Sequence, residues 1–85
     1  MRKTLILIIS CILSLTLNAQ LNTDRLTSIG RNALYFEDYV LSIQYFNQVI
    51  NAKPFLIDPY YYRAIAKIQL EDYVGAEADL NIVIE

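Results

Sequence analysis

The sequence predicts an all-α fold in which antiparallel helix pairs stack as a short α-solenoid. The first observation is an internal repeat, since the segment Glu37-Asp38-Tyr39-Val40 returns 34 residues later as Glu71-Asp72-Tyr73-Val74. Residues 37–50 and 71–84 agree at seven of fourteen positions. The second is that apolar residues recur at helical spacings of three and four. Self-similarity at a fixed period of this size is typical of repeat proteins, in which each helix pair buries its apolar face on its neighbours.

The start of the chain predicts a secretory signal peptide over residues 1–19. Arg2 and Lys3 precede an apolar run, Leu5–Leu17, and Ala19 then stands before polar residues. A basic start, a short apolar centre and a small residue at the end are typical of a cleaved signal, so we expect cleavage after Ala19. The alternative is an uncleaved membrane anchor, but crossing a bilayer takes about 20 apolar residues, more than this run offers.

Cys11 is the only cysteine in the sequence. The segment Ile8-Ile9-Ser10-Cys11 loosely resembles the lipid-attachment box of bacterial lipoproteins. The apolar run continues beyond Cys11, however, which favours a small apolar residue inside a signal helix over a lipid anchor. After cleavage the chain has no thiol and cannot rely on disulfides or cysteine-bound zinc.

Residues 20–85 predict one small domain with an acidic balance. They carry five basic and nine acidic side chains, a formal net charge of −4. This balance argues against nucleic acid as a partner, because such binding depends on Lys and Arg neutralising phosphates. We expect the membrane to be involved only through the signal peptide during export.

The first helix is expected over residues 24–36, capped by Asn22 or Thr23. Its buried face would carry Leu26, Ile29, Ala33 and Phe36. Gly30 lies inside this face, where a glycine costs about 1 kcal/mol of helix propensity. Its presence predicts that the backbone of the next helix comes very close.

The second helix is expected over residues 39–52, after Asp38 as the N-cap and before Lys53-Pro54. Its buried stripe would carry Tyr39, Ile43, Phe46 and Ile50, with Ser42 and Val49 beside it. Small residues, Ser42 and its counterpart Ala76, are expected where the two helices of a pair would otherwise collide.

The third helix is expected to open at Asp58-Pro59, an N-cap acid followed by proline at the first helical position. We assign Tyr60 to helix packing, together with Ala64, Ala66 and Ile68. Arg63, Lys67 and Glu71 form a line of charge that predicts a solvated or partly stacked edge. The fourth helix would start from Asp72 and turn inward Tyr73, Ala76, Leu80, Val83 and Ile84.

This helix–turn–helix unit resembles the tetratricopeptide repeat (TPR). The matching positions are Gly30, Asp38, Tyr39, Ser42, Phe46, Val49 and Pro54 in the first repeat, and Tyr60, Ala64, Asp72, Tyr73, Ala76, Leu80 and Val83 in the second. Repeat one would cover about 23–56 and an incomplete repeat two about 57–85. The resemblance implies a right-handed superhelical solenoid. Departures include Ala33 and Lys67, which replace the mid-helix tyrosine of the family.

About three repeats are usually needed to bury a continuous core. We therefore expect this chain to be the N-terminal piece of a longer repeat protein or the product of a truncated reading frame. The competing explanation is self-association, in which two copies cover each other's open ends.

Function follows from the resemblance, because first helices of successive repeats line a groove that binds peptides or proteins in this family. The implied lining is Thr27, Arg31, Leu34 and Tyr35 from the first repeat, and Tyr61, Ile65, Ile68 and Gln69 from the second. Aromatic residues and Arg are enriched at interface centres, which suits an apolar or extended peptide. An equally open alternative is that these groups contact further repeats of the same chain. The Lys/Asn clamp of family members that bind acidic C-terminal tails is not visible here.

Catalysis and cofactors are not expected. The sequence has no histidine, no cysteine after cleavage, no Gly-rich phosphate loop and no recognisable nucleophile motif. No loop of alternating acids with a central glycine suggests calcium. The sequence thus predicts an exported protein-interaction module or scaffold, periplasmic, envelope-associated or secreted. The alternative is a structural N-terminal capping segment of a larger envelope-associated repeat protein, with no ligand of its own.

Overall fold

The computed structural model describes residues 22–85, which form four helices and contain no strand. The first helix covers residues 22–35, and it is followed by α2 (Tyr39–Ala52), α3 (Asp58–Gln69) and α4 (Tyr73–Ile84). The predicted signal peptide, with Cys11, lies outside the described residues. Among the helices that are described, none is long and apolar enough to cross a membrane.

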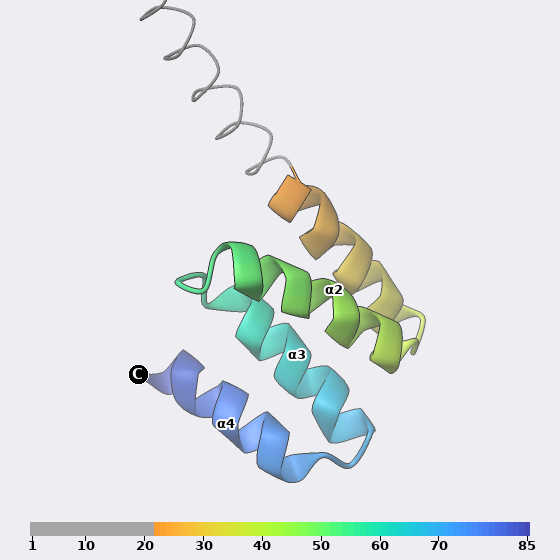
Figure 1. The fold of residues 1–85 in the computed structure, drawn as a ribbon. Helices are drawn as coiled ribbons and strands as arrows, with labels where there is room; N and C mark the ends of the chain where they lie inside the picture. Colours follow the sequence, from red (N-terminus) through yellow and green to blue (C-terminus); the bar gives the residue numbers. More distant parts are fainter. Residues whose placement is uncertain (1–21) are drawn as a thin grey trace, which may run out of the picture.

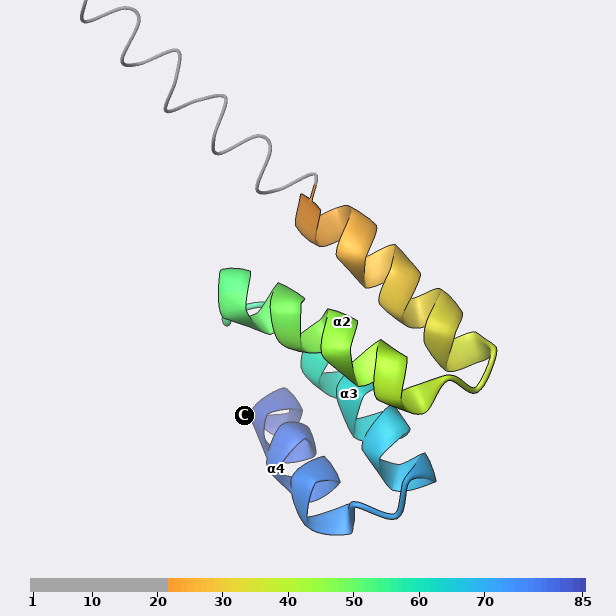
Figure 2. The same cartoon turned by 45° about the vertical axis from the view of Figure 1, so that its right-hand side comes forward.

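The helices pack in the order in which they follow one another in the chain (Figure 1). The helix over residues 22–35 lies along α2, and α3 packs against both α2 and α4. Figure 2 shows the same arrangement after a turn, with neighbouring helices running in opposite directions. The prediction of an all-α fold built from stacked antiparallel helix pairs is confirmed.

The two turns inside the helix pairs are matched atom by atom at the 34-residue spacing. In the first turn the backbone N–H of Asp38 donates to the carbonyl of Ala33 at 2.8 Å, and that of Glu37 to Leu34 at 3.1 Å. In the second turn Asp72 donates to Lys67 at 2.8 Å and Glu71 donates to Ile68 at 3.0 Å. This pair of bonds is the Schellman motif, which satisfies the last carbonyls of a helix.

Glu37 and Glu71 occupy the left-handed position of these motifs, with φ of 65° and 63°. Glycine is the usual residue there, because a Cβ is strained at positive φ. The repeat is therefore visible in the backbone as well as in the sequence.

Asp38 and Asp72 hold the N-cap positions predicted for them, whereas Asp58 does not. Asp72 caps α4 as expected, since its carboxylate accepts a bond from the N–H of Gly75 at 3.0 Å. Asp38 stands at the N-cap of α2, but its side chain makes no capping bond. Asp58 is the first residue of α3 and Ile57 holds the N-cap position. The negative charge of Asp58 still lies at the positive end of the helix dipole.

Most of the core lies where α3 meets its two neighbours, and the first helix adds one residue to it. Its buried apolar side chains are Ala33, Phe46, Val49, Tyr60, Ala64, Ala66 and Ala76. Ser42 is also fully buried, and its hydroxyl donates to the carbonyl of Tyr39 at 2.7 Å. The inward assignment of Tyr73 and Ile84 is wrong, because they are 62% and 81% exposed. Helix α4 is apolar on more sides than α3 can cover.

Gly30 is close to a side chain and not to a backbone. A Cβ at this position would lie 2.9 Å from Cε1 and 3.0 Å from Cζ of Phe46. The close approach expected from the sequence is therefore real, but an aromatic ring from α2 fills the space that the glycine leaves.

Candidate functional site

A hollow of about 280 Å³ lies along the exposed side of the helix over residues 22–35. It is lined by Ser28, Arg31, Asn32 and Tyr35, which lie one helical turn apart on the same face. Arg31 and Tyr35 were expected to line the groove. Ser28 and Asn32 were not expected there. They lie three residues before Arg31 and Tyr35, respectively, however, a spacing that places all four on one face of a helix.

Arg31 is positioned by an aromatic stack that reaches down into the core. Its guanidinium carbon lies 5.2 Å from the centre of the Tyr62 ring on α3. The Tyr62 ring in turn stacks on Phe46 of α2, with centroids 5.6 Å apart and planes at 20°. Phe46 is completely buried. An exposed cation on the first helix thus rests on rings supplied by the next two helices.

Tyr61 extends this aromatic surface. Its ring meets that of Tyr62 edge to face, with centroids 5.7 Å apart, and it remains 48% exposed. The two neighbours on α3 point in different directions, as successive helical residues must. Tyr62 was missed in the sequence because nothing local distinguishes the tyrosine that faces Phe46 from the one that faces solvent.

A second hollow, of about 470 Å³, lies between the first helix and the start of α3. It is lined by Asp24, Thr27 and Ser28 from the first helix and by Leu56, Ile57, Asp58 and Pro59 from the connection into α3. Ser28 lines both hollows, so the two depressions adjoin. The contribution of residues 56–59 was not expected from the sequence, which pointed only to helical positions.

The predicted groove residues divide into two sets. Thr27, Arg31 and Tyr35 line the hollows, and Tyr61 belongs to the aromatic surface beside them. Leu34 and Ile65 are half-buried, while Ile68 and Gln69 are exposed further along α3 and line neither hollow. The structure thus brings the first set together and leaves the second outside these depressions.

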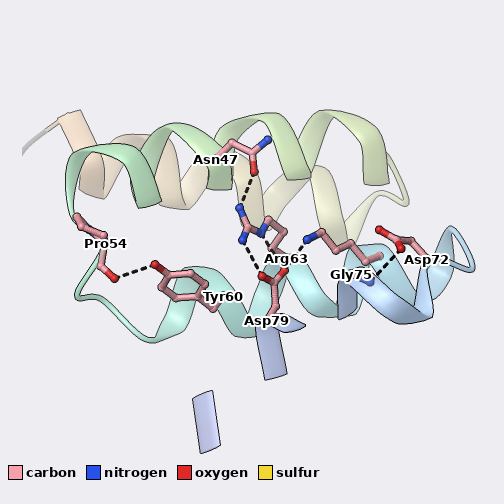
Figure 3. A network of polar contacts seen from close by, with 8 residues as sticks. Asn47, Pro54, Tyr60, Arg63, Asp72, Gly75 and Asp79 are labelled. Atoms are coloured by element: carbon pink, nitrogen blue, oxygen red, sulfur yellow. Dashed lines mark hydrogen bonds and ion pairs between the residues drawn. The ribbon is translucent and has the colours of Figure 1, made fainter. Parts of the chain in front are cut away.

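A polar network on the other side of α3 joins three helices (Figure 3). Asp79 of α4 is 2% exposed. Its carboxylate accepts two hydrogen bonds from Arg63 and forms an ion pair with Lys67 at 2.9 Å. Arg63 also donates to the Oδ1 of Asn47 on α2 at 2.8 Å. The prediction that Arg63 and Lys67 belong to a solvated or partly stacked edge of charge is therefore corrected. Arg63 does lie over the ring of Tyr60, 5.6 Å from its centre, but both cations turn to a buried carboxylate.

The network shifts the pKa values of Asp79 and Arg63 in opposite directions. Burial by itself raises the pKa of Asp79, but the hydrogen bonds and charges of Arg63 and Lys67 outweigh it and hold that pKa below its ordinary value. The hydrogen bond to Asp79 is the largest influence on the pKa of Arg63 and raises it.

Near the start of α3, the hydroxyl of Tyr60 donates to the carbonyl of Pro54 at 2.8 Å. The network thus holds the helices in register.

Comparisons of this chain with protein-family models, with curated proteins and with solved structures gave no match in any of the three.

Proposed function

We propose that this chain is an exported, non-catalytic protein-interaction module of tetratricopeptide type, which binds an extended peptide segment on the face formed by its first helix and α3. The observation that carries the proposal is the pair of adjoining hollows beside an exposed aromatic surface. Arg31, Tyr35 and Tyr61 are residue types enriched at interface centres. Support for the repeat type comes from the 34-residue period and the two matched Schellman turns.

The groove is built to be pre-organised. Tyr62 is held by its stack on Phe46, and Arg31 rests on Tyr62, so neither group has to be ordered when a ligand arrives. Less lost side-chain freedom leaves more of the contact energy for binding. Rigid aromatic anchors of this kind are typical of interface hot spots.

The proposal is tested by screening the full chain against an array of nonapeptides, alongside Tyr61→Ala and Arg31→Ala variants. We expect a set of peptides whose binding falls about tenfold or more in both variants, as for a hot-spot truncation above 1.4 kcal/mol. Gln44→Ala is the matched control, because Gln44 is exposed on α2 and lines neither hollow. Circular dichroism checks that all variants stay helical. Peptides that bind all four proteins equally would reject this face as the site.

A purely structural role is the second candidate, and the exposed apolar side chains of α4 favour it. Val74 and Ile84 are each more than four-fifths exposed, and such surfaces often contact another element. In that case α4 would stack on further repeats or on a partner, and replacing Arg31 or Tyr61 would change no interaction. The same array therefore separates the two candidates.

Export rests on the pattern of residues 1–19. Expression in a secretion-competent host, followed by mass measurement of the product, tests it. A chain that begins at Gln20 supports export with cleavage, and a retained N-terminus argues for an anchor.

A further inference from the structure

Every residue that lines the smaller hollow can donate a hydrogen bond, and the only charged one is Arg31. Ser28, Arg31, Asn32 and Tyr35 each carry an N–H or O–H group, and no carboxylate is among the lining residues. Within residues 22–85 both ion pairs are made by Asp79, with Arg63 and Lys67, so Arg31 has no acidic partner there. In a domain with more acidic than basic side chains, this is an uncompensated and exposed guanidinium.

The position of Arg31 over an aromatic ring suits a carboxylate ligand. Its guanidinium lies over the Tyr62 ring, at 5.2 Å from the centre. A guanidinium that rests on an aromatic ring keeps the N–H groups at its rim free, and these match the two oxygens of a carboxylate. Asn32 and Tyr35 add donors at the edge of the same depression.

The larger hollow has the opposite character. Asp24 and Asp58 supply carboxylates, while Leu56, Ile57 and Pro59 supply apolar walls. A Lys or Arg side chain suits such a place, because its aliphatic stem covers apolar surface while its charged head reaches the acids.

Resting on the proposed function above, we propose that the ligand is an extended peptide carrying an acidic side chain on Arg31 and a basic side chain in the larger hollow. Because both hollows are lined by Ser28, one extended chain can occupy both, and we assign the carboxylate on Arg31 to an Asp or Glu side chain. Asp24 and Arg31 are seven residues apart, about 10 Å along a helix axis. An extended chain covers that distance in about three residues.

The test uses the full chain and nonapeptides with amidated C-termini, in which positions three and six vary independently through all residue types. Binding is measured by fluorescence anisotropy. We expect enrichment of Asp or Glu at one position and Lys or Arg at the other. Replacing Glu by Gln in the peptide should weaken binding about tenfold, as for the loss of a charge-assisted hydrogen bond. The Arg31→Gln variant of the protein should lose a similar factor. The two losses should not add. Arg25→Gln is the matched control, an exposed arginine on the same helix outside both hollows.

A charge exchange sharpens the result. Arg31→Glu should reject the acidic peptide and accept the one with Lys at that position. Equal binding of Glu and Gln peptides, with Tyr61→Ala still disruptive, would overturn this inference and leave the proposed function standing. A peptide whose only carboxylate is its free C-terminus, if it binds as tightly, would overturn the side-chain assignment. No binding by any peptide would overturn both.

Discussion

Arg63 on α3 holds the buried carboxylate of Asp79 on α4 through two bonds, from Nε to Oδ2 at 2.8 Å and from Nη2 to Oδ1 at 2.6 Å. The third nitrogen of the same guanidinium donates to Asn47 on α2. One side chain therefore links the two helices that flank α3. The positions 34 residues before Arg63 and Asp79 hold Ile29 and Tyr45, so this ion pair has no counterpart in the first repeat.

Replacing Asp79 by Asn should destabilise the domain. The change keeps the shape of the side chain but leaves Arg63 and Lys67 without a counter-charge. Breaking a fully buried pair costs about 3–5 kcal/mol, and the partial exposure of both cations reduces this to about 2 kcal/mol. Urea unfolding followed by circular dichroism measures the loss. Glu77→Gln, at an exposed acid on the same helix, should change stability by less than about 0.5 kcal/mol. Equal unfolding midpoints for both variants would contradict the structural role of Asp79.

The same carboxylate should make stability depend on acid pH. The pKa of Asp79 is lower in the folded chain than its ordinary value of about 3.9. Between these two values the unfolded chain binds more protons, so stability rises with pH. The contribution is complete above about pH 5, declines as pH falls past the unfolded value and is lost as pH falls through the folded pKa. Urea titrations from neutral to acid pH should show a smaller loss in Asp79→Asn than in the original chain. An identical pH profile for the two would argue against the shift.

The sequence was informative where structure depends on near neighbours and silent where it depends on distant ones. The apolar spacing and the turn residues predicted both ends of the first two helices, and the starts of the last two, to within two residues. Asp79 was missed because its partners, Arg63 and Lys67, lie sixteen and twelve residues away on another helix. The role of Tyr62 was missed for the same reason, because its ring stacks on Phe46, sixteen residues away on another helix. The resemblance to the tetratricopeptide repeat placed Arg31 and Tyr35 on the candidate face. Residues 56–59 line the larger hollow because the connection from α2 to α3 turns back toward the first helix, which no local pattern in the sequence predicts.

Glycine at either repeated turn should stabilise the domain. Glu37 and Glu71 both have positive φ, a conformation that costs a residue with a Cβ about 1–2 kcal/mol. Glycine removes this strain but adds freedom to the unfolded chain, so we expect a net gain of about 0.5–1 kcal/mol for Glu71→Gly. Thermal and urea unfolding test it. Glu77→Gly, inside α4, should lose about 1 kcal/mol, and the two variants should therefore move in opposite directions. A loss at both positions would show that the side chain of Glu71 makes a contribution larger than its strain.

Gly30 and Phe46 should behave as a coupled pair. A Cβ on Gly30 would lie 2.9 Å from the Phe46 ring, which is fully buried and stacked on Tyr62, so the ring has little room to move. Overpacking of this kind costs about 1–3 kcal/mol, of which better helix propensity recovers about 1 kcal/mol. Gly30→Ala should thus destabilise the chain by about 1 kcal/mol.

The second repeat combines a larger residue in place of Gly30 with a smaller one in place of Phe46. At the equivalent positions, 34 residues on, the chain has Ala64 and Leu80, a larger residue on one helix with a smaller one on the next. Phe46→Leu alone should lose stability because it leaves a void under Tyr62. Adding Gly30→Ala to it should recover part of that loss, giving a favourable coupling of about 1 kcal/mol in a double-mutant cycle measured by urea unfolding. Strict additivity would mean that the ring avoids the new methyl group without cost, and that this glycine is present for a reason other than the packing of Phe46.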